Sequence, residues 1–541
     1  MGYNIQIKPM LRRFPKLSLL AAFILSGVSS QATALDDIGV TLLREMTTNL
    51  NGSGIRMAQA EANTDGNTNH PSAFEVNPAA DPVQQPINLF TYYSSLGSTN
   101  GFPNAAGAES GHANIVGGII YGRTNGVAPN VAHVDNFDAD YFIQSYYDAL
   151  SNLVVALPPT NINDSIINQS FTFGNLSASD QRIVDAAYDD YAGSNNSFFV
   201  SAACNYSIRR RVCAPGTAYN CISVAAYGGD SSIGPTIDNG RSKPDITAPA
   251  NATSSSTPQV SGVAALLMQA ARRGDGGSDT NAAADLRTIK ALLLNGAVKP
   301  ANWTNSSSSP LDARYGAGVV NAFNAHRQLA GGKQIFCAAN PVASGGAHPP
   351  VAETNSVAAT SGWSWESISS SATDDAVNHY FFNVSNGMTT VTLVWNRQYG
   401  QSNINNLDLF LLNAANSNLV AGSTSRVDNV EHLFLPQLPA GRYDLQVLKY
   451  GGTNVVSDGE TYALAFAFVS PEPNLTKSGA NLTLTWPVYP AGFRAEAATN
   501  LVAPTWITND LPAPAITNNR NSLILQATNA FQFFRLRSPD F

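Results

Sequence analysis

Charged side chains are scarce in this sequence of 541 residues. Asp, Glu, Lys and Arg together make up 13% of it, about half of the share in an average soluble protein. The formal net charge is −8, and no block of Lys or Arg interleaved with aromatic residues occurs. Such blocks are the electrostatic mark of proteins that bind nucleic acid. The composition therefore gives no reason to expect a nucleic-acid partner.

Long hydrophobic runs are also missing. Beyond the N-terminal region no segment reaches about 18 consecutive apolar residues, the length that predicts a membrane-spanning helix. Residues 1–34 instead follow the pattern of a secretion signal, with an apolar run at 17–28 and the small-x-small sequence Ala32-Thr33-Ala34 before the cleavage point. The basic residues of its first part are Lys8, Arg12, Arg13 and Lys16. We predict a signal peptide at residues 1–34, no membrane anchor, and a secreted protein, either extracellular or periplasmic.

Cysteine is rare as well. The chain has four, Cys204, Cys213, Cys221 and Cys337, and export makes them candidates for disulfides. Four cysteines allow three pairings. A Cys213–Cys221 disulfide is preferred, because both residues lie in one predicted surface segment, while the pairing of Cys204 and Cys337 stays open. Cys204 is alternatively a small buried thiol.

A chain of this length predicts several domains. Residues 35–331 alternate short apolar runs with longer helical stretches, which is typical of an α/β domain with a mostly parallel sheet flanked by helices. The predicted strands cover residues 55–60, 118–121, 165–168, 198–203 and 222–226, and the predicted helices cover 138–156, 179–192, 258–271 and 284–297. In such sheets the chemistry gathers at the carboxyl ends of the strands.

The pattern changes after residue 331. Residues 332–350, rich in Ala, Gly and Pro, are interpreted as a linker. Residues 351–470 carry short strands of alternating polarity, which predict an all-β sandwich. A Pro-Glu-Pro break then precedes a small β domain at residues 471–541. These two domains are candidates for binding a surface or a polymer.

The sequence ATSSSTPQVSG at residues 252–262 is the first candidate for chemistry. A serine at the start of a helix lies near unpaired backbone N–H groups and the positive end of the helix dipole, which favour a developing oxyanion. Pro258 fits because it lies in the first turn. Residue chemistry alone does not choose among Ser254, Ser255 and Ser256, and a Ser/Thr-rich helix cap has a similar sequence.

This segment resembles the nucleophile motif G-T-S-x-A-x-P-x-V-A-G of the subtilisin-like serine proteases, the subtilases. The register of Pro258 and Gly262 with the motif implies that Ser254 is the nucleophile. The sequence GHANIVGGII from residue 111 resembles the family's histidine motif G-H-G-T-H-V-A-G-I-I, so His112 is the implied general base. The sequence VSAACN from residue 200 resembles V-A-A-A-G-N, so Asn205 is the implied oxyanion donor.

Other segments between about residues 50 and 330 resemble the same family in the same order. They are GVAPN at 126–130, KPDITAP at 243–249 and GAGVVNA at 316–322. The sequence at 166–171 resembles the strand that pairs with substrate, which implies substrate-binding roles for Ser170, Phe171 and Thr172. Subtilases often bind structural calcium, but no dense group of acidic residues places a ligand set here. We therefore predict no metal ligand and no certain cofactor.

The third catalytic residue departs from the family pattern. In subtilases an aspartate ends the first strand, whereas here the sequence GIRMAQAEA at residues 54–62 places Glu61 at that position. A carboxylate there accepts the imidazole Nδ1–H and fixes the tautomer, and glutamate serves this role in other hydrolases. Asp65, four residues later, is an alternative carboxylate.

Three further residues replace family glycines, namely Ala113, Cys204 and Ala252. The predicted function is a secreted serine endopeptidase with a Ser-His-Glu triad, which cleaves protein or peptide substrates through an acyl-enzyme. One alternative is a weak or inactive protein that binds partners on a subtilase fold. Another is an esterase or related acyl hydrolase, although the chain lacks the G-x-S-x-G nucleophile elbow of that class.

Overall fold

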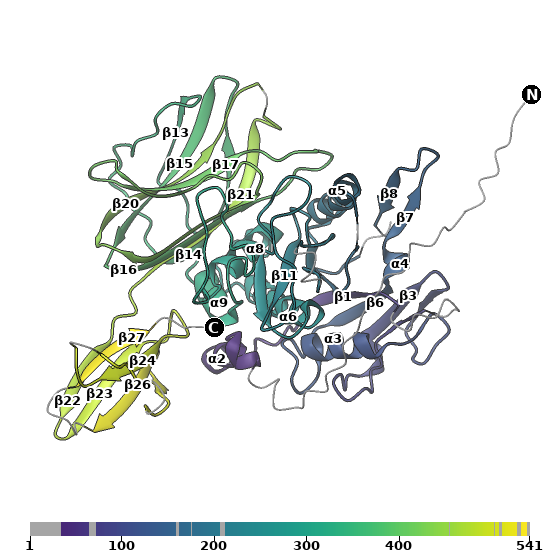
Figure 1. Cartoon of the computed structure of the whole chain (residues 1–541), viewed down its shortest axis with the longest axis horizontal. Helices are drawn as coiled ribbons and strands as arrows, with labels where there is room; N and C mark the ends of the chain where they lie inside the picture. Colours follow the sequence, from purple (N-terminus) through teal and green to yellow (C-terminus); the bar gives the residue numbers. More distant parts are fainter. Residues whose placement is uncertain are drawn as a thin grey trace, which may run out of the picture.

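The computed structural model describes residues 34–63, 72–157, 162–174, 176–205, 211–453, 455–501, 504–507, 511–526 and 532–537. The predicted signal peptide, apart from Ala34, and Asp65 lie outside these ranges. Three units follow one another along the chain (Figure 1): an α/β unit drawn in purple to teal, a β-sandwich in green, and a small β unit in yellow.

The α/β unit is built on an eight-stranded sheet of order β12-β11-β10-β9-β1-β6-β3-β4. Its strands are β1 (Arg56–Glu61), β3 (Phe90–Ser94), β4 (Gly97–Thr99), β6 (His133–Asp138), β9 (Ile166–Gln169), β10 (Phe198–Ala202), β11 (Ile222–Tyr227) and β12 (Ile246–Pro249). Neighbouring strands are parallel except β3 and β4. The predicted mostly parallel sheet is therefore confirmed.

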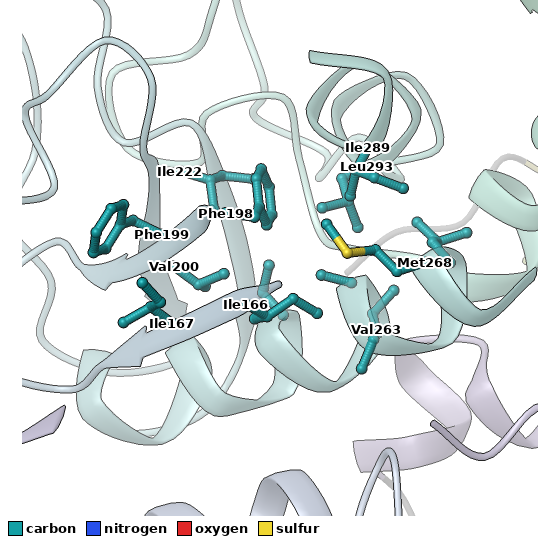
Figure 2. Packing of buried hydrophobic residues seen from close by; sticks show 14 of the residues in the cluster. Ile166, Ile167, Phe198, Phe199, Val200, Ile222, Val263, Met268, Ile289 and Leu293 are labelled. Atoms are coloured by element: carbon teal, nitrogen blue, oxygen red, sulfur yellow. The ribbon is translucent and has the colours of Figure 1, made fainter. Parts of the chain in front are cut away.

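Helices cover this sheet. They are α2 (Val40–Met46), α3 (Gly111–Tyr121), α4 (Ala139–Phe142), α5 (Ala178–Asn195), α6 (Thr253–Arg272), α7 (Thr280–Ala283), α8 (Leu286–Asn295) and α9 (Ala322–Ala330), with a 3₁₀ turn η1 (Ile87–Leu89). Helix α6 packs against α3 and against β9, β10 and β11. Figure 2 shows Val263 and Met268 of α6 in one buried cluster with the strand residues Ile166 and Val200 and with Ile289 of α8. Because α6 is buried along nearly its whole length, its first turn is held rigidly over the sheet.

Two predicted elements are wrong. Residues 118–121, predicted as a strand, form the last turn of α3, because a short apolar run alone does not distinguish a strand from a helix. Residues 138–156, predicted as a helix, form short α4 and a hairpin of β7 (Gln144–Tyr147) and β8 (Leu153–Ala156). Asp148 Oδ1 accepts the N–H groups of Leu150 and Asn152 in the hairpin turn. This local bonding stabilises a turn where a helix was expected.

The second unit is the predicted β-sandwich. One sheet has the order β13-β15-β20-β17-β18 and the other β14-β21-β16-β19. The strands are β13 (Ala338–Ala343), β14 (Ser361–Ser369), β15 (Asp374–Val384), β16 (Gly387–Trp395), β17 (Leu407–Asn413), β18 (Leu419–Ser423), β19 (Val430–Leu438), β20 (Gly441–Lys449) and β21 (Gly459–Val469). Strand β13 corrects the linker prediction for residues 332–350, because it pairs with β15 at the sheet edge.

The sandwich packs directly on the α/β unit. Its sheet β14-β21-β16-β19 lies against α8 and α9, and buried Trp363 of this sheet joins the core of the α/β unit. Arg397, which follows β16, forms ion pairs with Asp189 and Asp190 of α5. The two units therefore share apolar and polar contacts across their junction.

The small β unit contains β22 (Asn474–Ser478), β23 (Asn481–Pro487), β24 (Arg494–Ala498), β25 (Ala515–Thr517), β26 (Arg520–Gln526) and β27 (Phe533–Arg537). Its described core is centred on Leu484, Trp486 and Leu523. The two remaining short strands, β2 (Ala73–Glu75) and β5 (Ala108–Glu109), pair beside α3. Among the helices within the described ranges, none has the length and apolar character that a membrane-spanning helix requires.

Candidate active site

The sheet brings several predicted site residues to one edge. Glu61 ends β1, and Ser170 directly follows β9. Ala60 pairs with Gln169 in the parallel register, so Glu61 and Ser170 leave neighbouring strands side by side. Asn205 follows β10, and α6 begins shortly after β12. Because the carboxyl ends of parallel strands meet at one edge, these residues gather there.

His112 and Glu61 form a hydrogen-bonded pair. His112 is the second residue of α3, whose first turn is capped by the side chain of Ser110. Its Nδ1 lies 2.7 Å from Glu61 Oε2. The Glu61 side chain is 1% exposed and the His112 side chain 20%. Because a carboxylate only accepts, the bond holds the proton of a neutral imidazole on Nδ1 and leaves Nε2 as the basic nitrogen.

The environment of His112 shifts its pKa. Burial alone lowers the pKa of the imidazole, but the charge of Glu61 and the hydrogen bond to it raise it, and the net pKa lies above the ordinary value of 6.5. The imidazolium is therefore stabilised, as a general base requires when it takes up a proton.

Ser256 and Ser254, at the start of α6, differ in their contacts. Ser256 is fully buried, and its hydroxyl donates to the carbonyl of Thr253 at 3.1 Å. Ser254 and Ser255 are only half-buried. The carbonyl oxygen of Ser254 accepts a hydrogen bond from Ser170 Oγ at 3.1 Å. Ser254 is therefore tied to the segment that emerges beside Glu61, while the hydroxyl of Ser256 is used within its own helix.

Asn205 lies against the same helix start. Its Oδ1 accepts from the Thr253 N–H at 2.8 Å and from the Thr253 hydroxyl at 2.9 Å. A backbone N–H can only donate, so these bonds fix which end of the amide is oxygen. The Nδ2 end is consequently directed away from Thr253.

The predicted substrate segment lies beside this helix. Ser170 and Phe171 are buried, Thr172 is half-buried, and Thr172 Oγ1 contacts Cys204 Sγ at 3.5 Å. The backbone of Phe173 pairs with that of Ala214. The segment is thus held by contacts to α6 on one side and to the chain around Asn205 on the other.

The predicted disulfide between Cys213 and Cys221 is wrong. The structure does not join these residues, and none of the four cysteines, all within described ranges, is bonded to another. Cys221 is fully buried in the core just before β11, whereas Cys213 is half-buried and its thiol contacts the carbonyl of Arg211. The two thiols face different environments, although they are close in sequence.

The three residues that stand where the family has glycine differ in backbone conformation. Ala113 is an ordinary helical residue within α3. Ala252 has φ −145° and ψ 149°, an extended conformation that suits alanine. Cys204 has φ +96°, a region that side chains with a Cβ rarely adopt. Cys204 therefore carries backbone strain directly before Asn205.

This strain predicts an unusual order of stability. At position 204 we expect Cys204→Gly to be more stable than Cys204→Ala by about 1 kcal/mol, because only glycine relieves the positive φ. The matched control is Ala203→Gly, one residue earlier and buried, where glycine should destabilise by about 1 kcal/mol. Urea unfolding measures all three. A Cys204→Gly variant less stable than Cys204→Ala would contradict the strain.

Within the described ranges no group of three His, Cys, Asp or Glu side chains is arranged to hold a metal ion. Sequence reasoning missed two residues of the site, Gln59 and Tyr121, which lie behind Glu61. A polar residue two positions before Glu61 was the available signal, because alternate strand residues share a face.

Comparison with known proteins finds a family match for part of the chain. Residues 88–318 match the model of the Subtilase family. This part of the chain belongs to the subtilases. The matched range contains His112, Asn205 and Ser254 and begins after Glu61. Subtilases are serine peptidases, and the domain is therefore a serine protease domain by family. No curated protein matches the chain.

Several solved structures are similar to this chain. The prenylagaramide maturation protease PagA is 21% identical, with 54% of this chain and 99% of that chain covered and a TM-score of 0.33. Fervidolysin from Fervidobacterium pennivorans, described as a keratinolytic enzyme related to subtilisin, is 13% identical, with 84% and 73% covered and a TM-score of 0.37. The Aeromonas sobria serine protease, in complex with its chaperone, is 14% identical, with 91% and 89% covered and a TM-score of 0.33.

Proposed function

We propose that this chain is a secreted serine endopeptidase that cleaves peptide bonds through an acyl-enzyme. The triad is Ser254, His112 and Glu61. The observation that carries the proposal is the 2.7 Å hydrogen bond between His112 Nδ1 and buried Glu61, at the sheet edge where the helix of Ser254 begins. A carboxylate behind an imidazole is the arrangement that general-base activation of a serine requires.

Each residue has a defined step. Nε2 of His112 removes the proton from Ser254 Oγ as this oxygen attacks the peptide carbonyl. The tetrahedral oxyanion accepts hydrogen bonds from Asn205 Nδ2 and the Ser254 N–H. His112 then gives its proton to the leaving amine, and water releases the acyl group by the same route. The segment from Ser170 to Thr172 pairs with the substrate backbone.

Export completes the proposal. The basic, apolar and small-residue pattern of residues 1–34 supports secretion, and the substrates are then proteins or peptides outside the cytoplasm. We assign the sandwich and the small β unit a role in attachment to a surface or polymer, separate from the chemistry.

A fluorophosphonate probe tests the assignment directly. The folded full-length protein should become covalently labelled, with the label on the peptide that contains Ser254, because the probe reacts only with an activated serine. The Ser254→Ala variant and heat-unfolded wild type should not be labelled. Absence of labelling in the folded wild type would overturn the proposal and favour a binding protein on a subtilase fold.

A further inference from the structure

A chain of buried hydrogen bonds continues behind the catalytic pair. Glu61 uses its second carboxylate oxygen, Oε1, to accept from Gln59 Nε2 at 2.9 Å. Gln59 Oε1 in turn accepts from the hydroxyl of Tyr121. Gln59 and Tyr121 have no exposed surface, and Glu61 has 1%. The sequence of contacts therefore runs from Tyr121 through Gln59 and Glu61 to His112.

The amide of Gln59 is fully used in this arrangement. Besides Glu61, its Nε2 donates to the carbonyl oxygen of Ala113 at 3.0 Å. Both amide hydrogens thus have acceptors, and the amide oxygen has a donor, which fixes the orientation of the group. Ala113 follows His112 in α3, so the same amide ties β1 to the helix turn that carries the imidazole.

Sequence periodicity explains why these groups meet. Gln59 and Glu61 lie two apart on β1 and share one face. Ala113, Gly117 and Tyr121 lie four apart on α3 and share one face. A Cβ at Gly117 would lie 2.6 Å from the Tyr121 hydroxyl, closer than van der Waals contact allows. Glycine at position 117 therefore makes room for the tyrosine hydroxyl to reach Gln59.

The chemistry of the three side chains fits a positioning role. A buried amide destabilises a fold unless it is hydrogen-bonded, and an apolar residue would fill the same space without that requirement. Burial, with the charges of Tyr92 and Glu61, raises the pKa of Tyr121 well above its ordinary value, so its hydroxyl remains a donor. Glutamate has one more rotatable bond than aspartate, and a second anchor on its carboxylate restricts that freedom.

We propose that Gln59 is a positioning residue of the active site: its amide holds Glu61 in the rotamer that meets His112 Nδ1, and Tyr121 holds the amide. This inference rests on the proposed function, because it assigns Gln59 a role through the Ser254–His112–Glu61 triad. It also accounts for glutamate in place of the aspartate that other subtilases use.

Two variants test the role of this contact chain. Gln59→Leu removes the hydrogen bonds from the Gln59 amide to Glu61 and to Ala113. We expect kcat to fall by about 10- to 100-fold with little change in KM, since a shift of about 1 Å in a catalytic group has effects of this size. Tyr121→Phe removes one hydroxyl and should lower kcat less. The matched control is Tyr92→Phe, which removes a neighbouring buried hydroxyl that donates to the carbonyl of Val76 and should leave kcat unchanged.

The pH profile and a double-mutant cycle separate positioning from a merely structural role. Glu61 is the charged group that raises the pKa of His112. A displaced Glu61 should therefore move the acid limb of kcat/KM to lower pH in Gln59→Leu, while Tyr92→Phe keeps the wild-type limb. In a Glu61→Ala background, Gln59→Leu should have a much smaller effect on kcat, because the route to His112 through the carboxylate is gone and only the Ala113 contact is lost.

The outcomes distinguish this inference from the proposed function. Fluorophosphonate labelling of wild type with unchanged kcat and acid limb in both Gln59→Leu and Tyr121→Phe would overturn the inference alone. An equal loss of kcat in the Glu61→Ala background would also overturn it. Failure to label wild type would overturn the proposed function itself. If thermal unfolding shows that Gln59→Leu does not fold, the kcat and the acid limb of Tyr121→Phe decide whether the inference holds.

Discussion

Replacing Ser254 with alanine is expected to lower kcat by about 10⁶-fold, because a triad without its nucleophile keeps only oxyanion stabilisation and substrate binding. Substrate binding itself should change little, since the Ser254 carbonyl, which accepts from Ser170 Oγ, is retained in alanine. Hydrolysis of a chromogenic peptide under single-turnover conditions measures the change in the chemical step.

The neighbouring serines are matched controls for this result. Ser255→Ala and Ser256→Ala should each retain most of the wild-type kcat. The hydroxyl of Ser256 donates to the Thr253 carbonyl within its own helix, so its removal affects the helix start rather than the chemistry. Wild-type turnover by Ser254→Ala, or its loss only in Ser255→Ala, would move the nucleophile to another residue and refute the assignment.

Glu61→Gln should lower kcat by about 10⁴-fold, the size of effect known for loss of the carboxylate in a Ser-His-Asp triad. The substituted amide has almost the same shape, but its N–H end can face His112 Nδ1 and stabilise the wrong tautomer. The neutral residue also removes the charge that raises the pKa of His112, so the imidazolium is less favourable. Peptide hydrolysis across a range of pH measures both effects, and the acid limb of kcat/KM should move to lower pH.

The aspartate variant sharpens this test. Aspartate is the residue that the family pattern favours, but Glu61→Asp shortens the side chain by about 1.5 Å and withdraws both oxygens from His112 and Gln59. We expect kcat to fall by about 10- to 100-fold rather than to rise. Asp65→Asn, which removes the alternative carboxylate, should have no effect. A large loss in Asp65→Asn with normal activity in Glu61→Gln would assign the role to Asp65.

The buried network also bears on whether the departures from the family pattern mark a lost activity. Glu61 and Gln59 are nearly without solvent contact, and burial of such polar groups is unfavourable unless each is bonded. The pair of Glu61 and His112 is hydrogen-bonded in this way despite the departures from the family pattern. The backbone strain at Cys204, directly before Asn205, is also unfavourable by itself. Such strain persists only where the surrounding structure holds it, and it clusters at functional sites.

Local sequence patterns predicted much of the fold. The buried runs at β9, β10 and β11 and the helical periodicity of α5, α6 and α8 were identified, because each is long or regular enough to specify its period. The sandwich followed from alternating polarity in strands such as β16 and β17. The hairpin at residues 144–156 could not be predicted in this way, since its turn depends on Asp148 bonding to a backbone that the helical pattern concealed.

In the candidate site, too, some features could be predicted from the sequence and others could not. Motifs in the sequence indicated which residues are chemically suited to the site, namely a carboxylate, a histidine, an amide and a serine at a helix start, in the chain order of the subtilase motifs. The contacts themselves depend on the folded chain: Glu61 bonds to His112, Gln59 bonds to Ala113, and Cys213 is not joined to Cys221. These contacts join residues brought together by the pairing of β1 with its neighbours and the packing of α3 beside it. Because a hydrogen bond depends on distances of a few tenths of an ångström, sequence spacing cannot specify it, and the packed sheet and helices do.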